Sequence, residues 1–204
     1  MNLRPDIPAS VASDEWLKID REAEVHRIVS ALRDQLRGIR KRGLVLGLSG
    51  GIDSSVSVAL AVRAVGAKNV LALFMPENDS DPESLVLGRE VADHFGVEAV
   101  VEDIGPTLQA MGCYERRDAF IRELVPEYGP DWCSKVVIAS SLEGEGYNIS
   151  SLVVQDPDGK LTKRRMSPSA YLGIVAATNM KQRTRKQIEY YHADRLNYAV
   201  LGTP

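Results

Sequence analysis

An apolar run is followed by two glycines, three serines and one aspartate. Among the segments of the sequence, this one has the residue types and spacing best suited to chemistry. The segment reads Leu44-Val-Leu-Gly-Leu-Ser-Gly-Gly-Ile-Asp-Ser-Ser55. Glycines let a backbone approach a phosphate closely, and the exposed N–H groups of a helix start point toward it. The serines add hydroxyl donors, whereas Asp53 would repel a bare phosphate unless a Mg²⁺ ion lay between them. The pattern therefore predicts a phosphate-binding loop that uses a divalent cation.

Two other interpretations fit this segment less well. It could be an ordinary strand–helix turn in which Asp53 or Ser54 caps the helix. A cap does not require two glycines and three hydroxyls, so we favour the phosphate loop. The segment is not a Walker A loop, because no Gly-Lys-Ser/Thr follows the glycines.

A second group of polar residues, Asn179-Met-Lys-Gln-Arg-Thr-Arg-Lys186, places four cations and an amide in eight residues. On a helix Lys181 and Arg185 share one face, and Arg183 lies roughly opposite them. The four cations therefore cannot all serve one ligand. Taken alone, the segment is more typical of a solvated helix face that has acidic partners.

Alternating strands and helices must position both groups. Residues 44–48, 69–75 and 97–101 are apolar and predict buried strands, and the intervening segments 56–63 and 83–95 predict helices. This alternation implies parallel strands joined by right-handed crossovers.

In such sheets ligands bind beyond the carboxyl ends of the strands. The serine–glycine loop and the polar loop 77–81 should both lie at that edge. Helical spacing of apolar residues up to Ile39 predicts a helix that starts at Ser13 and covers the sheet, with a subunit interface as the less favoured role. The remaining predictions are an irregular arm at 1–12, short helices at 107–111 and 119–125, a strand or helix end at 135–139, a β-hairpin at about 147–167 with a plain turn at Asp156–Gly159, a helix from Ser167 to about Asp194, and a strand at 198–201.

Composition limits the classes of function. The 204 residues suffice for one sizeable α/β domain, and 44% apolar residues is ordinary for a soluble protein. A net charge of −3 gives no overall field to attract nucleic acid. No apolar run approaches the ~20 residues that span a membrane. Two cysteines are too few for a disulfide framework, which fits a reducing cytoplasm. We expect both thiols to be inert and the three histidines to be structural or surface residues rather than catalysts.

These motifs carry a resemblance to known enzymes. Ser-Gly-Gly-x-Asp-Ser after an apolar strand resembles the pyrophosphate loop of the N-type ATP pyrophosphatases. The Asn-x-Lys-x-Arg-x-Arg segment, followed by Leu201-Gly-Thr203, is similar to the ammonia-dependent NAD synthetase family. Because loop, cationic segment and strand occur in the family's order, the resemblance covers the chain from about residue 20 to its end.

The resemblance implies a fold and a set of site residues. The fold would be a three-layer α/β sandwich of the adenine-nucleotide α-hydrolase-like, Rossmann-like type, filling residues 13–204 with the hairpin inserted, and the family usually forms homodimers. Asp53 would bind Mg²⁺ and take part in catalysis with Ser49 and Ser54. Arg183, with Asn179 and Lys181, would contact deamido-NAD. The residues implied to bind ATP are Gly47, Leu48, Ser49, Gly50, Gly51, Ile52, Asp53, Ser54 and Thr203.

The implied reaction is the ATP-dependent amidation of deamido-NAD to NAD through an acyl adenylate, which releases AMP and pyrophosphate. No glutamine-hydrolysing segment precedes the loop, so free ammonia or a separate partner would supply the nitrogen. The family continues past the position of Pro204 with a second Mg²⁺-binding glutamate, and the chain as given is therefore expected to be incomplete and poorly active. The alternatives are another adenylating amidotransferase with the same loop, or a nucleotide-binding module without chemistry.

Overall fold

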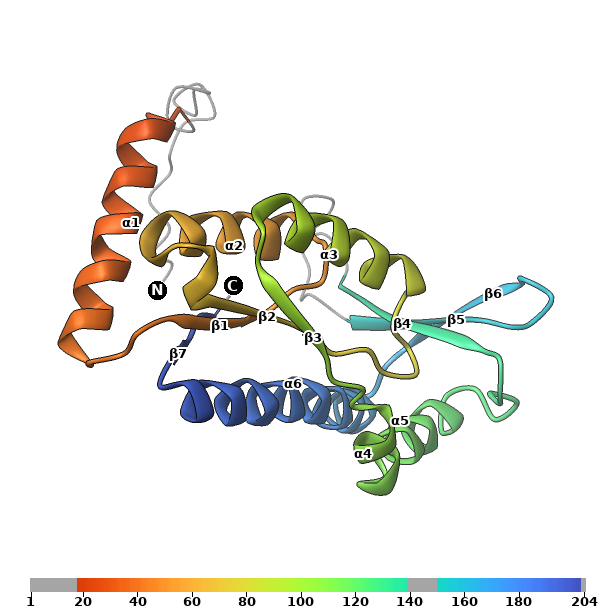
Figure 1. Cartoon of the computed structure of the whole chain (residues 1–204). Helices are drawn as coiled ribbons and strands as arrows, with labels where there is room; N and C mark the ends of the chain where they lie inside the picture. The colour runs from red at the N-terminus through yellow and green to blue at the C-terminus, as the bar shows by residue number, and fades with distance from the viewer. Residues whose placement is uncertain (1–17, 139–149, 203–204) are drawn as a thin grey trace, which may run out of the picture.

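A parallel sheet of four strands, in the order β3-β2-β1-β7, lies between two layers of helices. The structure is a computed structural model and describes residues 18–138 and 150–202. The strands are β1 (Leu44–Gly47), β2 (Val70–Phe74), β3 (Glu98–Val101) and β7 (Ala199–Val200). Helices α2 and α3 cover one face of the sheet and α6 covers the other (Figure 1). This arrangement confirms the predicted three-layer α/β fold.

Most of the predicted helices are present. The helices are α1 (Arg21–Gly38), α2 (Ile52–Val65), α3 (Pro82–Phe95), α4 (Gly105–Ala110), α5 (Cys113–Arg122) and α6 (Pro168–Leu196), with a short 3₁₀ turn η3 (Ala67–Asn69). Gly96 ends α3 in the left-handed conformation, as its position after the apolar pattern predicts.

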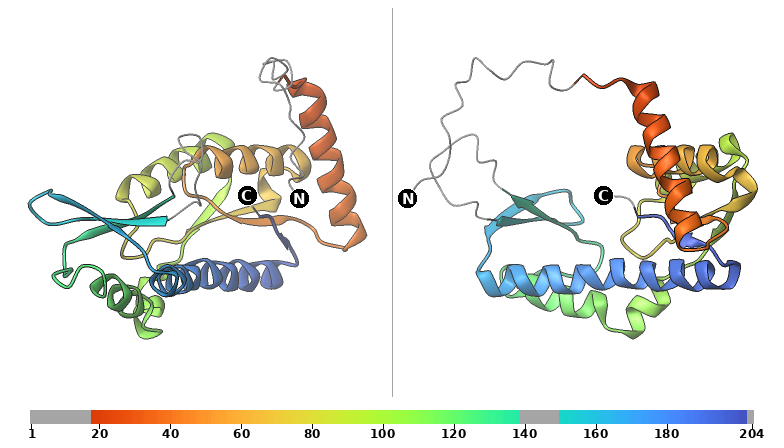
Figure 2. Two further views of the ribbon diagram at one scale, coloured as in Figure 1. Left: turned by 180° about the vertical axis from the view of Figure 1, so that it is seen from behind. Right: turned by 90° about the vertical axis from the view of Figure 1, so that its left-hand side faces the viewer.

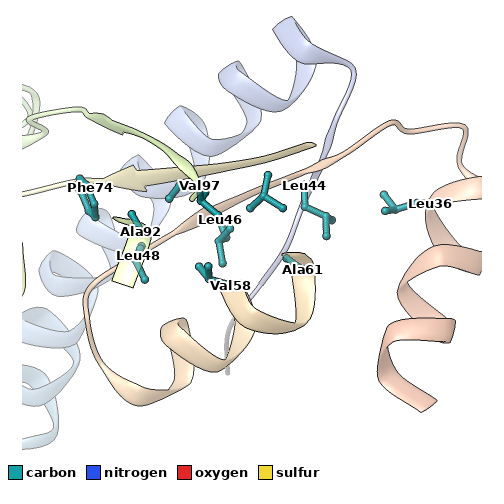
Figure 3. Packing of buried hydrophobic residues seen from close by; sticks show 11 residues of the cluster. Leu36, Leu44, Leu46, Leu48, Val58, Ala61, Phe74, Ala92 and Val97 are labelled. Carbon is teal, nitrogen blue, oxygen red and sulfur yellow. The ribbon is translucent and has the colours of Figure 1, made fainter. Parts of the chain in front are cut away.

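The alternation of side chains along β1 divides the core into two parts. Leu44 and Leu46 pack with Val58 of α2 in one buried cluster (Figure 3). Val45, which points to the opposite face, packs with Leu71 of β2 and with residues of α6. Because both faces of β1 are buried, its sequence is a continuous apolar run rather than an alternating one.

Helix α1 differs from its prediction in start and in role. It begins at Arg21, where the Asp20 carboxylate accepts a hydrogen bond from the Ala23 N–H, and residues 18–20 are not helical. The prediction of a start at Ser13 is therefore wrong, although residues 13–17 themselves lie outside the described part. The helix also does not cover the sheet. It packs against α2, and Arg33 donates to the Ala64 carbonyl near the end of that helix (Figure 2).

A second, antiparallel sheet contains the predicted hairpin. Strands β5 (Ser150–Gln155) and β6 (Leu161–Arg165) are joined by a turn with Gly159 at φ 84°, and β4 (Cys133–Ile138) pairs with β5. The 135–139 segment is thus a strand as far as Ile138. The Asp156 carboxylate accepts a hydrogen bond from the Lys160 N–H, which confirms the plain turn.

Helix α6 connects the two sheets as one unbroken helix of 29 residues (Figure 2). Ser167 caps it, since its hydroxyl accepts a hydrogen bond from the Ala170 N–H. Its first half packs against α5, and its second half packs against β1. Within residues 18–138 and 150–202, no helix is long and apolar enough to cross a membrane.

Candidate functional site

A pocket of about 730 Å³ opens at the carboxyl ends of β1 and β2. We call it the strand-end pocket. Its walls come from the β1–α2 loop, the segment that follows β2, the first turn of α3 and one face of α6. The pocket therefore lies at the edge of the sheet where the topology predicts ligand binding.

The β1–α2 loop is held in shape by its own hydroxyls. The Ser54 hydroxyl donates to the Gly51 carbonyl (2.9 Å) and accepts from the Ser49 N–H (3.3 Å). The Ser49 hydroxyl lies 3.2 Å from that of Ser54 and accepts from the Gly51 N–H. Gly47, Leu48, Ser49 and Ser54 line the strand-end pocket. Both predicted catalytic serines therefore face the same space.

The first turn of α2 has no side-chain cap. Gly51 occupies the N-cap position, whereas α1, α3 and α6 are each capped by a side chain. The interpretation of Asp53 or Ser54 as the cap is therefore wrong. An uncapped helix start leaves backbone N–H groups without acceptors, and an anion can take that place.

Gly50 adopts φ 75° and lies against α3. A Cβ at this position would lie 2.5 Å from Leu87 Cβ and 2.8 Å from the Gly88 backbone nitrogen. Glycine is therefore required by backbone conformation and by close packing.

We expect Gly50→Ala to destabilise the protein by about 1–3 kcal/mol, because it adds a steric clash to left-handed backbone strain. Urea unfolding measures this cost. Gly96→Ala is the matched control, since Gly96 is also left-handed but has no atom within 4 Å of its Cβ position. Equal costs in the two variants would show that the contact with α3 is unimportant.

Asp53 lies in the first turn of α2 with an exposed side chain. No group of three or more His, Cys, Asp or Glu side chains that could hold a metal occurs among the described residues. One carboxylate is nevertheless a common protein contribution to a Mg²⁺ site, where phosphates and water complete the shell. The residues present thus fit a metal that arrives with a nucleotide.

Helix α6 contributes residues to the strand-end pocket and to a second, outer groove. Gln182, Arg185, Lys186 and Glu189 line the strand-end pocket, at the helical spacing of one face. Arg183 lies on the outer side, in a shallow groove of about 560 Å³ with Tyr190 and Tyr191. The prediction that Arg183 and Arg185 point in different directions is confirmed.

Lys181 is tied to the loop that follows β2. Its ammonium group forms ion pairs with Asp79 and with Glu77 Oε1 (3.1 Å). The Tyr114 hydroxyl donates to Glu77 Oε2 (2.9 Å), and Arg117 pairs with Asp79. This Lys181 cluster anchors the 77–81 loop to α5 and α6, because its members come from all three segments.

The Asp79 carboxyl of the Lys181 cluster has a pKa that its surroundings shift. Burial raises the pKa of the Asp79 carboxyl, but the hydrogen bond from Lys181 and the charges of Arg117 and Lys181 outweigh it, and the net pKa is lowered. A lowered folded-state pKa stabilises the fold above the unfolded value of about 3.9, and the effect is lost as the pH falls through the folded pKa.

We therefore expect wild type to be more stable than Asp79→Asn near neutral pH, and the difference to shrink as the pH falls from the unfolded value of about 3.9 through the lower folded-state pKa, below which the carboxyl is protonated in both states. Urea unfolding from pH 6 to pH 2 measures the difference. A difference that stayed constant over this range would contradict the role given to the Asp79 charge.

The other predicted ligands are placed less centrally. Asn179 is exposed on α6 and lines neither of the two pockets described above. Gly50, Gly51 and Ile52 lie in the loop and at the start of α2. Thr203 lies outside the described residues.

Five charged residues that line the strand-end pocket were not among the predicted site residues, namely Glu77, Asp81, Arg185, Lys186 and Glu189. Helical spacing gave a usable signal for Arg185, which shares a face with Glu189. For Glu77 the only signal in the sequence is its position after the second predicted strand.

Of the cysteines and histidines, Cys113 and His192 are buried, whereas Cys133, His26 and His94 are exposed. Cys113 is buried, and burial raises the pKa of its thiol, as expected for an inert cysteine. His192 is buried and bonds Glu102 Oε1 through Nε2 (2.8 Å), with Arg195 at its other nitrogen.

The fold and site together define an α/β protein in which a glycine- and serine-rich loop and an uncapped helix start lie beside a pocket at the end of the parallel strands. The family model described as NAD synthase matches residues 24–125. The NH(3)-dependent NAD(+) synthetase of Rhizobium meliloti (strain 1021) is 81% identical over 204 residues, which is 100% of this chain and 61% of that protein. The chain belongs to the NAD synthase family.

Solved structures share the fold. The NH3-dependent NAD synthetase from Campylobacter jejuni aligns with a TM-score of 0.55 and 21% identity, over 92% of this chain and 58% of that one. An NMN synthetase from Francisella tularensis aligns with a TM-score of 0.56 and 20% identity, over 92% and 56%. The chain spans about three fifths of the length of the Rhizobium meliloti protein and of these two structures.

Proposed function

We propose that the protein forms NAD from deamido-NAD, ATP and ammonia, and releases AMP and pyrophosphate. The observation that carries the proposal is the uncapped, hydroxyl-lined start of α2 at the mouth of the strand-end pocket, in a chain of this family. The name of the Rhizobium meliloti relative supports ammonia as the nitrogen donor.

The β1–α2 loop would hold the phosphates of ATP. The donors would be the backbone N–H groups at the start of α2, which no side chain caps, and the hydrogen bonds of Ser49 and Ser54 within the loop hold these donors in place. Fixed donors need little reorganisation when charge develops on a phosphate, which is why such loops can stabilise a transition state. Asp53 would hold Mg²⁺, whose chemistry is to neutralise phosphate charge during adenylyl transfer.

The protein itself needs to supply little covalent chemistry. The carboxylate of the acid substrate attacks the α-phosphorus of ATP, pyrophosphate leaves, and ammonia then displaces AMP from the acyl adenylate. The protein must hold two anions close together and in line, and proximity alone can remove a large part of such a barrier. The apolar lining at Phe74, Met75 and Leu85 would exclude water from the nucleoside part.

We propose Arg183, Asn179 and Lys181 as contacts for deamido-NAD on the strength of the sequence resemblance. Lys181 already has two carboxylate partners, so its contribution would be to hold the 77–81 loop. Homodimer formation, the cytoplasmic location and the lack of nucleic-acid partners are proposals of the same kind.

One assay tests the proposed function. The natural gene product is incubated with ATP, Mg²⁺, deamido-NAD and ammonium, and NAD, AMP and pyrophosphate are measured. We expect equal amounts of the three products. Nicotinate mononucleotide is the comparison substrate, because the fold is shared with an NMN synthetase. AMP and pyrophosphate without NAD would indicate another acid substrate, and ATP binding without any cleavage would indicate a module without chemistry.

A further inference from the structure

The four cations between Lys181 and Lys186 have separate environments, and among the residues that the structure describes only one of the four lines the strand-end pocket without an ion-pair partner. Lys181 pairs with Glu77 and Asp79. Lys186 lies 2.6 Å from Glu189 Oε2. Arg183 is exposed in the outer groove. Arg185 is half-buried, lines the pocket and has no ion-pair partner among residues 18–138 and 150–202.

The acidic residues of the strand-end pocket are already engaged. The Glu77 carboxylate accepts hydrogen bonds from the Lys181 ammonium and the Tyr114 hydroxyl, and the Glu189 carboxylate accepts one from Lys186. Asp81 caps α3 by accepting from the Glu83 N–H (2.9 Å). Arg185 is therefore the positive charge that the described walls leave available for a ligand.

The phosphate loop itself lacks a cation. Residues 44–55 contain no lysine or arginine, unlike a Walker A loop, which carries its own lysine to the phosphates. Ser49 and Ser54 line the same pocket as Arg185. Any cationic side chain that contacts the ligand's phosphates therefore comes from another element, and α6 places Arg185 in the same pocket.

We propose that Arg185 binds a phosphate group of the nucleotide ligand in the strand-end pocket, across from the β1–α2 loop. The proposal rests on the proposed function, because it assumes a phosphate-bearing substrate. The planar guanidinium offers a fork of N–H donors that matches two phosphate oxygens, and its partial burial strengthens the attraction to an anion. The phosphate can belong to ATP or to the acid dinucleotide, which share this chemistry.

Titration calorimetry with Mg²⁺ tests the proposal on the natural gene product. Wild type, Arg185→Ala and Arg185→Lys are titrated with ATP, deamido-NAD and adenosine. We expect Arg185→Ala to weaken binding of one phosphate ligand about 10- to 100-fold and to leave adenosine within about twofold, since a hydrogen bond to a charged group contributes that much affinity. Arg185→Lys should recover part of the loss, because a lysine keeps the charge but not the fork.

The ligand whose affinity falls in Arg185→Ala is the one whose phosphate Arg185 contacts. A loss for ATP alone assigns Arg185 to ATP, and a loss for deamido-NAD alone assigns it to the acid substrate. Arg165→Ala, an exposed arginine on β6 outside the pocket, is the matched control for the loss of one positive charge.

Three results would overturn the proposal. Unchanged binding of both phosphate ligands would show that Arg185 contacts neither, and an equal loss for adenosine would show a merely structural effect. If wild type binds neither ATP nor deamido-NAD, the proposed function is wrong as well. The wild-type titration therefore distinguishes failure of the Arg185 proposal from failure of the proposed function. If thermal unfolding shows Arg185→Ala to be unfolded, Arg185→Gln takes its place, since glutamine keeps helix propensity and removes the charge.

Discussion

Replacing Asp53 with asparagine is expected to lower the rate of NAD formation about 10²–10³-fold, which is the usual effect of removing one group that stabilises transition-state charge. Asparagine keeps the size of the side chain but removes the charge that would hold Mg²⁺. The fold should remain, because Asp53 is exposed and its interaction with the helix dipole of α2 contributes only about 0.3–1 kcal/mol.

Steady-state rates at increasing Mg²⁺ concentration, with thermal unfolding of each variant, measure both halves of this expectation. Glu90→Gln is the matched control, since it removes an exposed carboxylate from α3 outside the strand-end pocket. Wild-type turnover of Asp53→Asn at saturating Mg²⁺ would contradict the assignment of Asp53 as the Mg²⁺ ligand. A large loss of stability would instead give Asp53 a structural role.

The sheet and the position of the β1–α2 loop were predictable because their signals are local. β1 and β2 are buried on both faces, so each is a continuous apolar run bounded by glycine or proline. Gly50, Gly66 and Gly96 stand at positive φ, where the sequence pattern ends one element and begins the next. The order of strands and helices then placed the pocket at the correct edge of the sheet.

The start of α1 was not predictable from its pattern. Ser13-Asp-Glu and Asp20 both offer an oxygen to cap a helix, and only the structure shows that Asp20 is used. The role of α1 was missed for a related reason, because an amphipathic face does not reveal which element it packs against. Val29 and Leu36 are buried, but α1 packs against another helix, α2.

The pairing of charges in the site was also beyond the sequence. Lys181 and Glu77 are 104 residues apart, and Lys181 and Asp79 are 102 residues apart. Nothing local distinguishes a lysine that is neutralised in this way from an arginine such as Arg185, which has no ion-pair partner in the part of the chain that the structure describes. The charge run therefore looked like one group of candidate ligands, whereas the fold divides it among three environments.

Removing the charge of Lys181 is expected to cost about 3–5 kcal/mol of unfolding free energy, which is the usual effect of breaking a buried ion pair by deleting one partner. The side chains of Lys181 and Glu77 are only 11% and 5% exposed. Lys181→Met keeps much of the apolar stem and leaves the Glu77 carboxylate with the Tyr114 hydroxyl and the Asp79 N–H as donors. Urea unfolding measures the loss.

The double variant Lys181→Met with Glu77→Gln decides what Lys181 does. A neutral amide needs no counter-charge and can still accept from the Tyr114 hydroxyl, so the double variant should be more stable than Lys181→Met alone. If Lys181 only anchors the 77–81 loop, the affinity for deamido-NAD should recover together with the stability. Recovery of stability without recovery of deamido-NAD binding would show that Lys181 contacts the substrate directly, and a loss below about 1 kcal/mol in the single variant would contradict the anchoring role, because an uncompensated buried carboxylate costs more than that.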